Sequence, residues 1–297
     1  MKKYLSIVFN IIPGRLIMSS FLRKWIHRKN IPSGITSFCI GGSSLRMYSD
    51  NSPIAILMFW LGKTGYESQE IELWERLSES ATSIVEIGGN IGVYTIFGAS
   101  ANPQASYRVY EPVPYNYGLL KSNLEINNLN HVCVFESAVI SNPGLSEITL
   151  FIPSAESHYN SPTGGFIAGA ESIDRESSKN IIVKAVQSKD ILNDCDLLKL
   201  DTEGAEFEIL SGLSEALSVN RTTILVEVRR KTHKLRAWIV DLMASYDFVA
   251  LAYSIDGVWH EIEADKIPTI VLQEEFGTRD LILVPKSIKS KITNESL

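Results

Sequence analysis

The sequence has few cysteines and no cluster of them. Cys39, Cys133 and Cys195 are odd in number, far apart and without a Cys-x-x-Cys spacing. This pattern supports neither a disulfide framework nor a zinc site. Such sparse cysteine is typical of the reducing cytoplasm, which is the compartment we expect.

An excess of positive charge is also missing. The 297 residues include 28 Lys and Arg against 34 Asp and Glu, for a net charge of −6. Binding to nucleic acid needs a clustered basic excess, so we do not expect nucleic acid as a partner. The charge is uneven, however, because residues 1–30 contain seven basic side chains and no acidic one.

No apolar run is long enough to cross a bilayer, which needs ~20 mostly apolar residues. The apolar stretch over residues 6–22 is broken by Asn10, Pro13, Gly14 and Arg15. Two interpretations of the basic head stay open. It is a helical arm packed on the main domain, or a peripheral membrane anchor with Phe21 and Trp25 at the lipid headgroups.

Internal repeats and low-complexity segments are absent, and a 45% hydrophobic content is typical of a globular chain. We expect an N-terminal extension over residues 1–65 that packs on or caps one α/β domain over residues 66–297. The domain shows alternating strand and helix patterns, which predict a mostly parallel sheet with helices on both faces. The expected strands cover residues 83–87, 105–110, 131–135, 147–152, 181–186, 197–200, 223–228, 248–253 and 280–284, and the expected helices cover residues 67–80, 94–100, 115–127, 206–217 and 233–246.

A glycine turn follows the first of these strands. Gly88, Gly89 and Gly92 stand between the strand and the next helix, where glycine lets the backbone approach a ligand and free N–H groups point at it. In open α/β sheets ligands bind at this edge. A dinucleotide fingerprint needs Gly-x-Gly-x-x-Gly, and its third glycine is missing here.

Glu111 ends the next strand, 23 residues after Gly88. A carboxylate there can accept hydrogen bonds from both hydroxyls of a ribose, an arrangement that NAD-dependent oxidoreductases and methyltransferases share. The Glu-x-Gly-x-Asn-x-Gly pattern over residues 86–92 favours the smaller nucleoside ligand, S-adenosylmethionine.

Three ordered motifs resemble the FkbM family of S-adenosylmethionine-dependent methyltransferases. They are VEIGGNIGVYT at residues 85–95, VYEPVPYN at residues 109–116 and LKLDTEGAEFEIL at residues 198–210. The similarity covers roughly residues 66–285. It implies a class I fold, with a seven-stranded, mostly parallel sheet whose last strand is antiparallel. It also implies methyl transfer, usually to a hydroxyl of a sugar or natural product.

The resemblance also implies site residues. Glu86, Gly88, Asn90 and Gly92 match the cofactor loop, Glu111 the ribose ligand, and Asp201 the acidic strand end beside the transferred methyl group. Further expected cofactor contacts are Gly89, Thr95, Pro112 and Ser137. Two positions depart from the family pattern: Gly89 stands where Ala is common, which we interpret as a gain in flexibility, and Arg229 stands where a histidine-containing stretch is expected.

An alcohol is a poor nucleophile until its proton leaves, so a base or a metal is expected beside it. Asp201 is the first candidate base, and Glu203 and His158 are the others. His158 lies in a long Ser/Gly/Asn-rich loop over residues 153–180, which is expected to contact the acceptor. Glu203 and Glu206 are alternatively interpreted as acidic residues that cap the first helical turn.

A divalent cation held by Asp201, Glu203 and Glu227 is an alternative, although no resident metal is predicted. Two other functions stay open as well: an NAD-dependent oxidoreductase, and a nucleoside-binding protein without turnover. A nucleic-acid methyltransferase is disfavoured, because Leu-Asp-Thr-Glu at residues 200–203 replaces the Asn/Asp-Pro-Pro-Tyr/Phe motif that holds a flipped base. The expected partner is a small-molecule or glycosyl acceptor.

Overall fold

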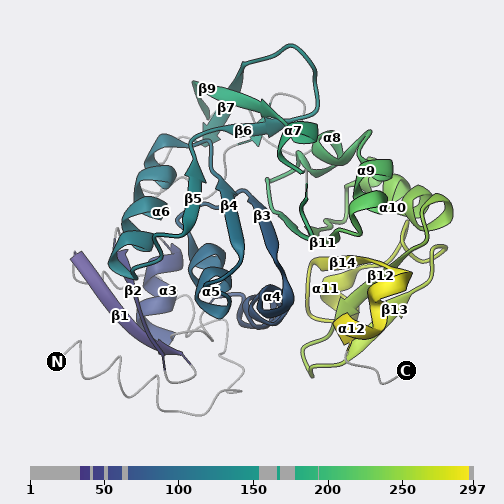
Figure 1. Ribbon diagram of the computed structural model, residues 1–297, viewed down its shortest axis with the longest axis horizontal. Coiled ribbons are helices and arrows are strands. Elements are labelled where there is room, and N and C mark those ends of the chain that lie inside the picture. Colours follow the sequence, from purple (N-terminus) through teal and green to yellow (C-terminus); the bar gives the residue numbers. More distant parts are fainter. Residues whose placement is uncertain are drawn as a thin grey trace.

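A computed structural model describes residues 34–40, 43–49, 53–61, 66–153, 166–167, 178–192 and 194–293. Its centre is an eight-stranded sheet with helices on both faces (Figure 1). The strands stand in the order β5 (Val132–Phe135), β4 (Ser106–Tyr110), β3 (Ser83–Ile87), β10 (Leu197–Leu200), β11 (Thr223–Glu227), β14 (Asp280–Pro285), β12 (Phe248–Tyr253) and β13 (Trp259–Ile262).

This order confirms the expected class I arrangement. β3, β4, β5, β10 and β11 pair in parallel, while β14 is antiparallel to both β11 and β12. β13, which the sequence analysis did not predict, adds an antiparallel edge strand next to β12. The chain order reverses between β3 and β10, so a ligand-binding crevice is expected at their carboxyl ends.

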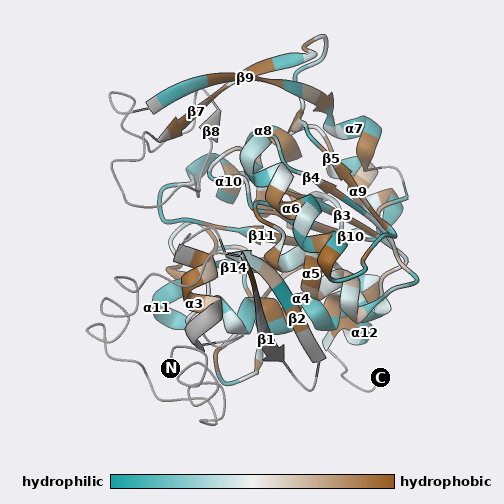
Figure 2. Ribbon diagram, turned by 90° about the vertical axis from the view of Figure 1, so that its left-hand side faces the viewer, coloured by the Kyte–Doolittle hydropathy of each residue, from teal (hydrophilic) through white to brown (hydrophobic). Residues whose placement is uncertain are grey.

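Alternation along the strands divides the core in two. Ile84 and Ile282 belong to one buried cluster, whereas their neighbours Val85 and Leu281 belong to the other. Figure 2 shows these inner strands mostly in the colour of hydrophobic residues. The first cluster is covered by α4 (Ser68–Ser80), α5 (Val93–Ala101) and α6 (Pro114–Ile126), and the second by α7 (Ser188–Ile191), α8 (Glu206–Leu210), α9 (Ser214–Asn220) and α10 (His233–Ser245).

The prediction of a single helix over residues 206–217 was wrong. The chain breaks between α8 and α9, where Gly212 has a φ of +84°. Glycine adopts this left-handed conformation without the steric cost that a Cβ imposes. Apolar periodicity continues across the break because both short helices bury one side against the same cluster, so the pattern conceals the turn. The other described helices are α3 (Pro53–Leu61), α11 (Leu272–Glu275), the 3₁₀ turn η3 (Lys286–Ile288) and α12 (Lys289–Thr293).

A second sheet rises above the carboxyl edge of the first, at the top of Figure 1. Its order is β6 (Ala138–Ile140), β9 (Ser178–Gln187), β7 (Glu147–Pro153) and β8 (Phe166–Ile167), with β7 antiparallel to β9. β8 and the start of β9 lie within the range that was expected to be loop. The segments 154–165 and 168–177, and His158 with them, lie outside the described residues.

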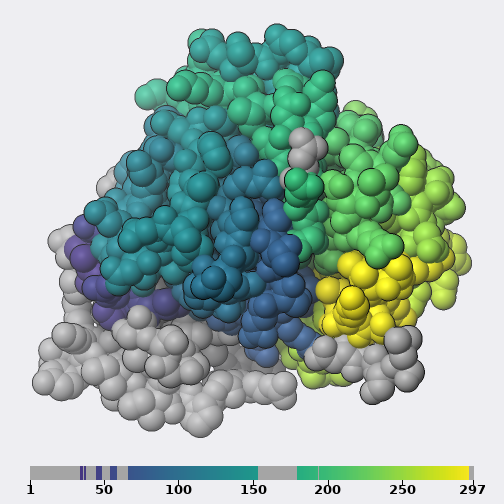
Figure 3. Space-filling view, in the orientation of Figure 1, coloured from purple at the N-terminus to yellow at the C-terminus, as the bar shows by residue number. Residues whose placement is uncertain are grey.

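The described part of the N-terminal extension docks on α6. β1 (Gly34–Ile40) and β2 (Ser43–Ser49) form a hairpin, drawn in purple beside α6 in Figure 3. Two asparagine side chains of α6 accept hydrogen bonds from backbone N–H groups of β2, as a neighbouring strand would. Asn123 Oδ1 accepts from Tyr48 N at 2.8 Å, and Asn127 Oδ1 accepts from Arg46 N at 2.9 Å. The domain boundary at residue 65 stays a prediction.

The basic head lies outside the described residues, so neither interpretation of it is tested. Within the described ranges, no helix combines the length and the apolar character that a membrane crossing needs.

Candidate functional site

A cavity of about 690 Å³ lies at the carboxyl ends of β3, β4, β10 and β11. Ligand pockets typically have such volumes. The cavity brings together most of the residues that the sequence analysis singled out: Gly88, Gly89, Asn90, Glu111, Pro112, Ser137, Asp201, Glu203 and Glu227.

The glycines of the turn allow close backbone approach. Gly88 has a φ of +92°, and a Cβ on it would lie 1.9 Å from the carbonyl oxygen of Asp201. A Cβ on Gly89 would lie 2.4 Å from Val109 Cγ2 and 2.7 Å from Leu120 Cδ1. The interpretation of Gly89 as a gain in flexibility was therefore wrong, because its missing side chain makes room for β4 and α6.

Glu111 is buried at the end of β4, and its carboxylate is fixed by backbone donors. Oε2 accepts from Asn90 N and Oε1 accepts from Val113 N, both at 2.8 Å. Burial raises the pKa of Glu111 to about 7, against the opposing effect of these hydrogen bonds. The Asn116 side chain supplies a third hydrogen bond, so about one of the four acceptor positions of the carboxylate remains for a ligand hydroxyl.

Asn90 stands beside Glu111 in the same cavity wall. Its φ is +47°, and its side-chain Oδ1 is buried without a hydrogen-bond partner in the part of the chain that the structure describes. Buried polar atoms are rarely left in this state. A bound ligand that carries a hydroxyl or amino group would satisfy it.

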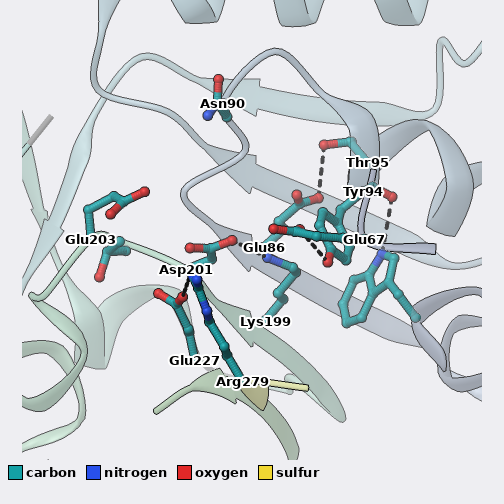
Figure 4. Close-up of polar contacts among 12 residues, drawn as sticks. Glu67, Glu86, Asn90, Tyr94, Thr95, Lys199, Asp201, Glu203, Glu227 and Arg279 are labelled. Carbon is teal, nitrogen blue, oxygen red and sulfur yellow. Dashed lines mark hydrogen bonds and ion pairs between the residues drawn. The ribbon is translucent and has the colours of Figure 1, made fainter. Parts of the chain in front are cut away.

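Asp201 lies at the end of β10, and Lys199 of the same strand holds it (Figure 4). Lys199 Nζ is 3.0 Å from Asp201 Oδ2 and 3.9 Å from the centroid of the Tyr94 ring. Burial alone would lower the pKa of Lys199, but Asp201 and Glu86 outweigh it and the pKa is raised. The Asp201 carboxylate is one-third exposed, so it remains accessible from the cavity.

Lys199 and Glu67 contribute to the site but were not among the predicted site residues. A lysine within the apolar strand LLKL was the available signal for the first, because lysine is almost never fully buried without a partner. Glu67 lines the cavity just before α4, has a φ of 38°, and accepts a hydrogen bond from Tyr94 OH at 2.9 Å. Burial, and then the negative charge of Asp201, raise its pKa. No local pattern points to it.

The three strand-end carboxylates that were considered as metal ligands are all paired with cationic side chains, Asp201 with Lys199 and the other two with Arg229. Arg229 donates to Glu203, and its Nε is 2.7 Å from Glu227 Oε2. Burial and the nearby Asp201 raise the pKa of Glu227 to about 7. Within the described ranges, no group of three His, Cys, Asp or Glu side chains is placed to hold a metal ion.

Glu206 holds the loop that leads into α8. Its Oε1 accepts hydrogen bonds from Thr202 N at 3.0 Å and from Gly204 N at 3.1 Å, which both precede the N-cap Ala205. The interpretation of Glu206 and Glu203 as caps of the first helical turn was therefore wrong: Glu206 binds the preceding loop and Glu203 is paired with Arg229.

A family model described as a methyltransferase FkbM domain matches residues 86–250, which is more than half of the chain. The chain belongs to the FkbM methyltransferase family.

Two relatives match part of the chain. Methyltransferase sdnD of Sordaria araneosa is 28% identical over 156 residues, which are 44% of this chain and 60% of that protein. Methyltransferase 1 of Beauveria bassiana (strain ARSEF 2860) is 25% identical over 146 residues, covering 44% of this chain and 58% of that protein. The chain therefore spans less than two thirds of the length of each relative.

Solved structures are similar as well. A methyltransferase FkbM from Methylobacillus flagellatus KT has 15% identity and a TM-score of 0.42, over 68% of this chain and 43% of that one. An O-methyltransferase from Bacillus cereus in complex with SAH has 16% identity and a TM-score of 0.40, over 74% of this chain and 81% of that one.

The FkbM match begins at Glu86, yet Glu86 does not line the cavity. Its Oε2 accepts from Thr95 Oγ1 at 2.8 Å and from Tyr107 OH at 2.7 Å. Thr95 and Gly92, also expected as cofactor contacts, lie outside the cavity lining, and Gly92 is the N-cap of α5. Side chains of β3 point alternately to the two faces of the sheet, and that of Glu86 points to the face covered by α5. Glu86, Gly92 and Thr95 therefore stabilise the FkbM loop and do not line the cavity.

Replacement of Glu86 by glutamine is expected to flatten the pH dependence of stability. Burial raises the pKa of Glu86 from 4.5 to about 7. The resulting stabilisation is fully present below pH 4.5 and is lost as the pH rises through 7, because the folded state must then ionise a buried acid. The free energy of unfolding, measured with urea, should fall between about pH 5 and 8 in the wild type. In Glu86→Gln this fall should be smaller by an amount on the order of 3 kcal/mol.

Glu125→Gln, an exposed change on α6, is the control and should keep the wild-type slope. An equal slope in Glu86→Gln would mean that Glu86 is already ionised in the folded state.

Proposed function

We propose that this chain transfers a methyl group from S-adenosylmethionine to a hydroxyl oxygen of a sugar or another small polar acceptor. The observation that carries the proposal is the placement of Glu111 and Asp201 in one cavity, on opposite sides of the glycine turn. β4 contributes Glu111 and β10 contributes Asp201, with β3 and Gly88 between them.

The residues present fit the cofactor. Glu111 has about one acceptor position left for a ribose hydroxyl, and the buried Asn90 Oδ1 can accept a hydrogen bond from the ligand. Glu67 and Asp201 add negative charge to the cavity, which favours a ligand with a positive sulfonium and an amino group. The bound cofactor would supply a methyl group that is already activated by its sulfonium.

The protein's remaining task is to place and deprotonate the acceptor. Asp201 is our proposed base: it is exposed to the cavity, and the Lys199 ammonium fixes its orientation. A positioned general base typically contributes 10²–10⁴-fold to a rate. Orientation of the hydroxyl adds to this, because a well-placed pair of reactants avoids the entropy cost of an encounter.

S-adenosylhomocysteine is expected to stabilise the folded chain, whereas NAD is not. At about 100 times its dissociation constant, the ligand should add ~2.7 kcal/mol to the free energy of unfolding. Thermal unfolding of the full chain with each ligand measures this. Stabilisation by NAD alone would contradict the proposal and favour an oxidoreductase. Binding of S-adenosylhomocysteine without methyl transfer to any hydroxylated acceptor would instead indicate a non-catalytic binding protein.

A further inference from the structure

A second cavity, of about 250 Å³, lies beside the first one. It is formed by the start of α8 and by the segment that joins β11 to α10. These segments follow the carboxyl ends of β10 and β11, on the edge of the sheet that also holds Asp201. Arg229 lines both cavities, so the smaller one adjoins the cavity of Asp201 at this side chain.

The lining of this side cavity is rich in cationic side chains: Arg229, Arg230, Lys231 and Lys234. The two arginines have carboxylate partners, since Arg229 pairs with Glu203 and Glu227, and Arg230 pairs with Glu274. Lys231 and Lys234 are exposed, and neither forms an ion pair with a carboxylate within the described residues.

Two carboxylates, Glu206 and Glu208, also line the side cavity. Glu206 is buried, and its Oε1 accepts three hydrogen bonds from the main chain and side chain of Thr202 and from Gly204 N. Glu208 is exposed and forms no ion pair with any described residue. Four cationic side chains therefore share this lining with two carboxylates, because the partners of the two arginines, Glu203, Glu227 and Glu274, do not line it. This local surplus of positive charge favours an anion.

The remaining lining is apolar. Phe207 and Leu235 form part of it, and Lys234 Nζ lies 5.8 Å from the centroid of the Phe207 ring. An aromatic face beside two lysines suits a molecule that has carbon atoms next to a charged end, because the carbon can pack on the ring while the lysines bind the oxyanion.

We propose that the side cavity binds an anionic group of the methyl acceptor, a phosphate or a carboxylate, through Lys231 and Lys234. This inference rests on the proposed function, because it places the acceptor hydroxyl at Asp201 and the charged end beyond Arg229. None of the residues of the glycine turn lines the side cavity, so the cofactor is not its occupant. Among sugars and other small polar acceptors, the inference therefore selects those with an anionic group, such as a sugar phosphate or a hydroxylated acid.

Calorimetric titration of the full chain with inorganic pyrophosphate and with succinate tests this inference. The titrations are made at constant ionic strength, with and without saturating S-adenosylhomocysteine. At least one of the two anions should bind, and the double variant Lys231→Met/Lys234→Met should weaken its binding about tenfold or more, since two charge-assisted contacts are lost. Glu208→Gln should strengthen the binding. The preferred anion identifies the charged group as phosphate-like or carboxylate-like.

The matched control removes two exposed lysines elsewhere, Lys189→Met and Lys266→Met, and should change anion binding by less than about twofold, because salt screens distant charges. The inference is overturned if neither anion binds, or if the Lys231/Lys234 variant binds as the wild type does. Failure of the proposed function is seen separately, as the absence of S-adenosylhomocysteine binding to a chain whose anion titration is unaffected.

Discussion

Glu111→Gln should weaken binding of S-adenosylhomocysteine by about 10- to 100-fold. A hydrogen bond from a ligand hydroxyl to the ionised carboxylate is worth roughly 1.5–3 kcal/mol, and one such bond is expected beside the three that Glu111 already accepts. Glutamine keeps the volume of the side chain, but its amide nitrogen is a donor where the carboxylate accepts from Asn90 N or Val113 N. Calorimetric titration at pH 8 gives the affinity.

The pH dependence of cofactor binding provides a second measurement at Glu111. Because burial raises its pKa to about 7, the carboxyl group is protonated in the ligand-free protein below that pH and ionised above it. The ionised form is the better acceptor for a ligand hydroxyl, so the wild-type affinity for S-adenosylhomocysteine should rise from about pH 6 to 8. The rise should be absent, or much smaller, in Glu111→Gln.

Glu125→Gln is the control for this experiment and should bind the ligand with wild-type affinity at each pH, since Glu125 is exposed on α6. A Glu111→Gln chain that melts normally and still binds the ligand within about threefold of the wild type would contradict our assignment, because a lost charged contact costs more than tenfold.

Asp201→Asn is expected to reduce turnover by about 10²–10⁴-fold while cofactor affinity changes little. Asparagine keeps the shape of the side chain but does not accept a proton from the acceptor hydroxyl. The proposed cofactor contacts are Glu111, which lies across the glycine turn from Asp201, and Asn90 within the turn, and both should be unaffected. Methyl transfer from labelled cofactor, measured beside binding of S-adenosylhomocysteine, separates the two effects.

Loss of Asp201 also leaves the buried Lys199 without its nearest partner, which can destabilise the fold. The double variant Asp201→Asn/Lys199→Met removes both charges and distinguishes unfolding from lost chemistry. Glu203→Gln is the comparison within the same cavity; Glu203 is paired with Arg229, so this variant should keep most of the activity. Wild-type turnover in Asp201→Asn would move the base elsewhere, with His158 the next residue to replace.

Much of the fold follows from local signals. Apolar runs that end in Gly88, Glu111 and Asp201 predicted three neighbouring strands, and their common edge is where the cavity lies. Secondary-structure predictions failed where the same local sequence pattern is compatible with two different structures. The α8–α9 turn is concealed by continuous apolar spacing, and β8 falls in a segment whose composition is typical of loops.

The errors at the site have a different cause. Glu86 and Thr95 are part of the motif that resembles the family's cofactor loop, but the pleat of β3 turns Glu86 toward α5, where it bonds Thr95 and Tyr107. Gly89 was interpreted from its flexibility, whereas its role depends on side chains of β4 and α6 that are distant in sequence.

The sequence by itself determined the order of strands and helices, the glycine turn, and the acidic residues at two strand ends, because periodicity and strand-ending residues are properties of short segments. Only the tertiary structure decided which carboxylates face the cavity and which are neutralised. Burial and ion pairing depend on distances between segments far apart in the chain. The pairing of Arg229 with Glu203 and Glu227, the contact of Lys199 with Asp201, and the side cavity beside Lys231 all arise in this way.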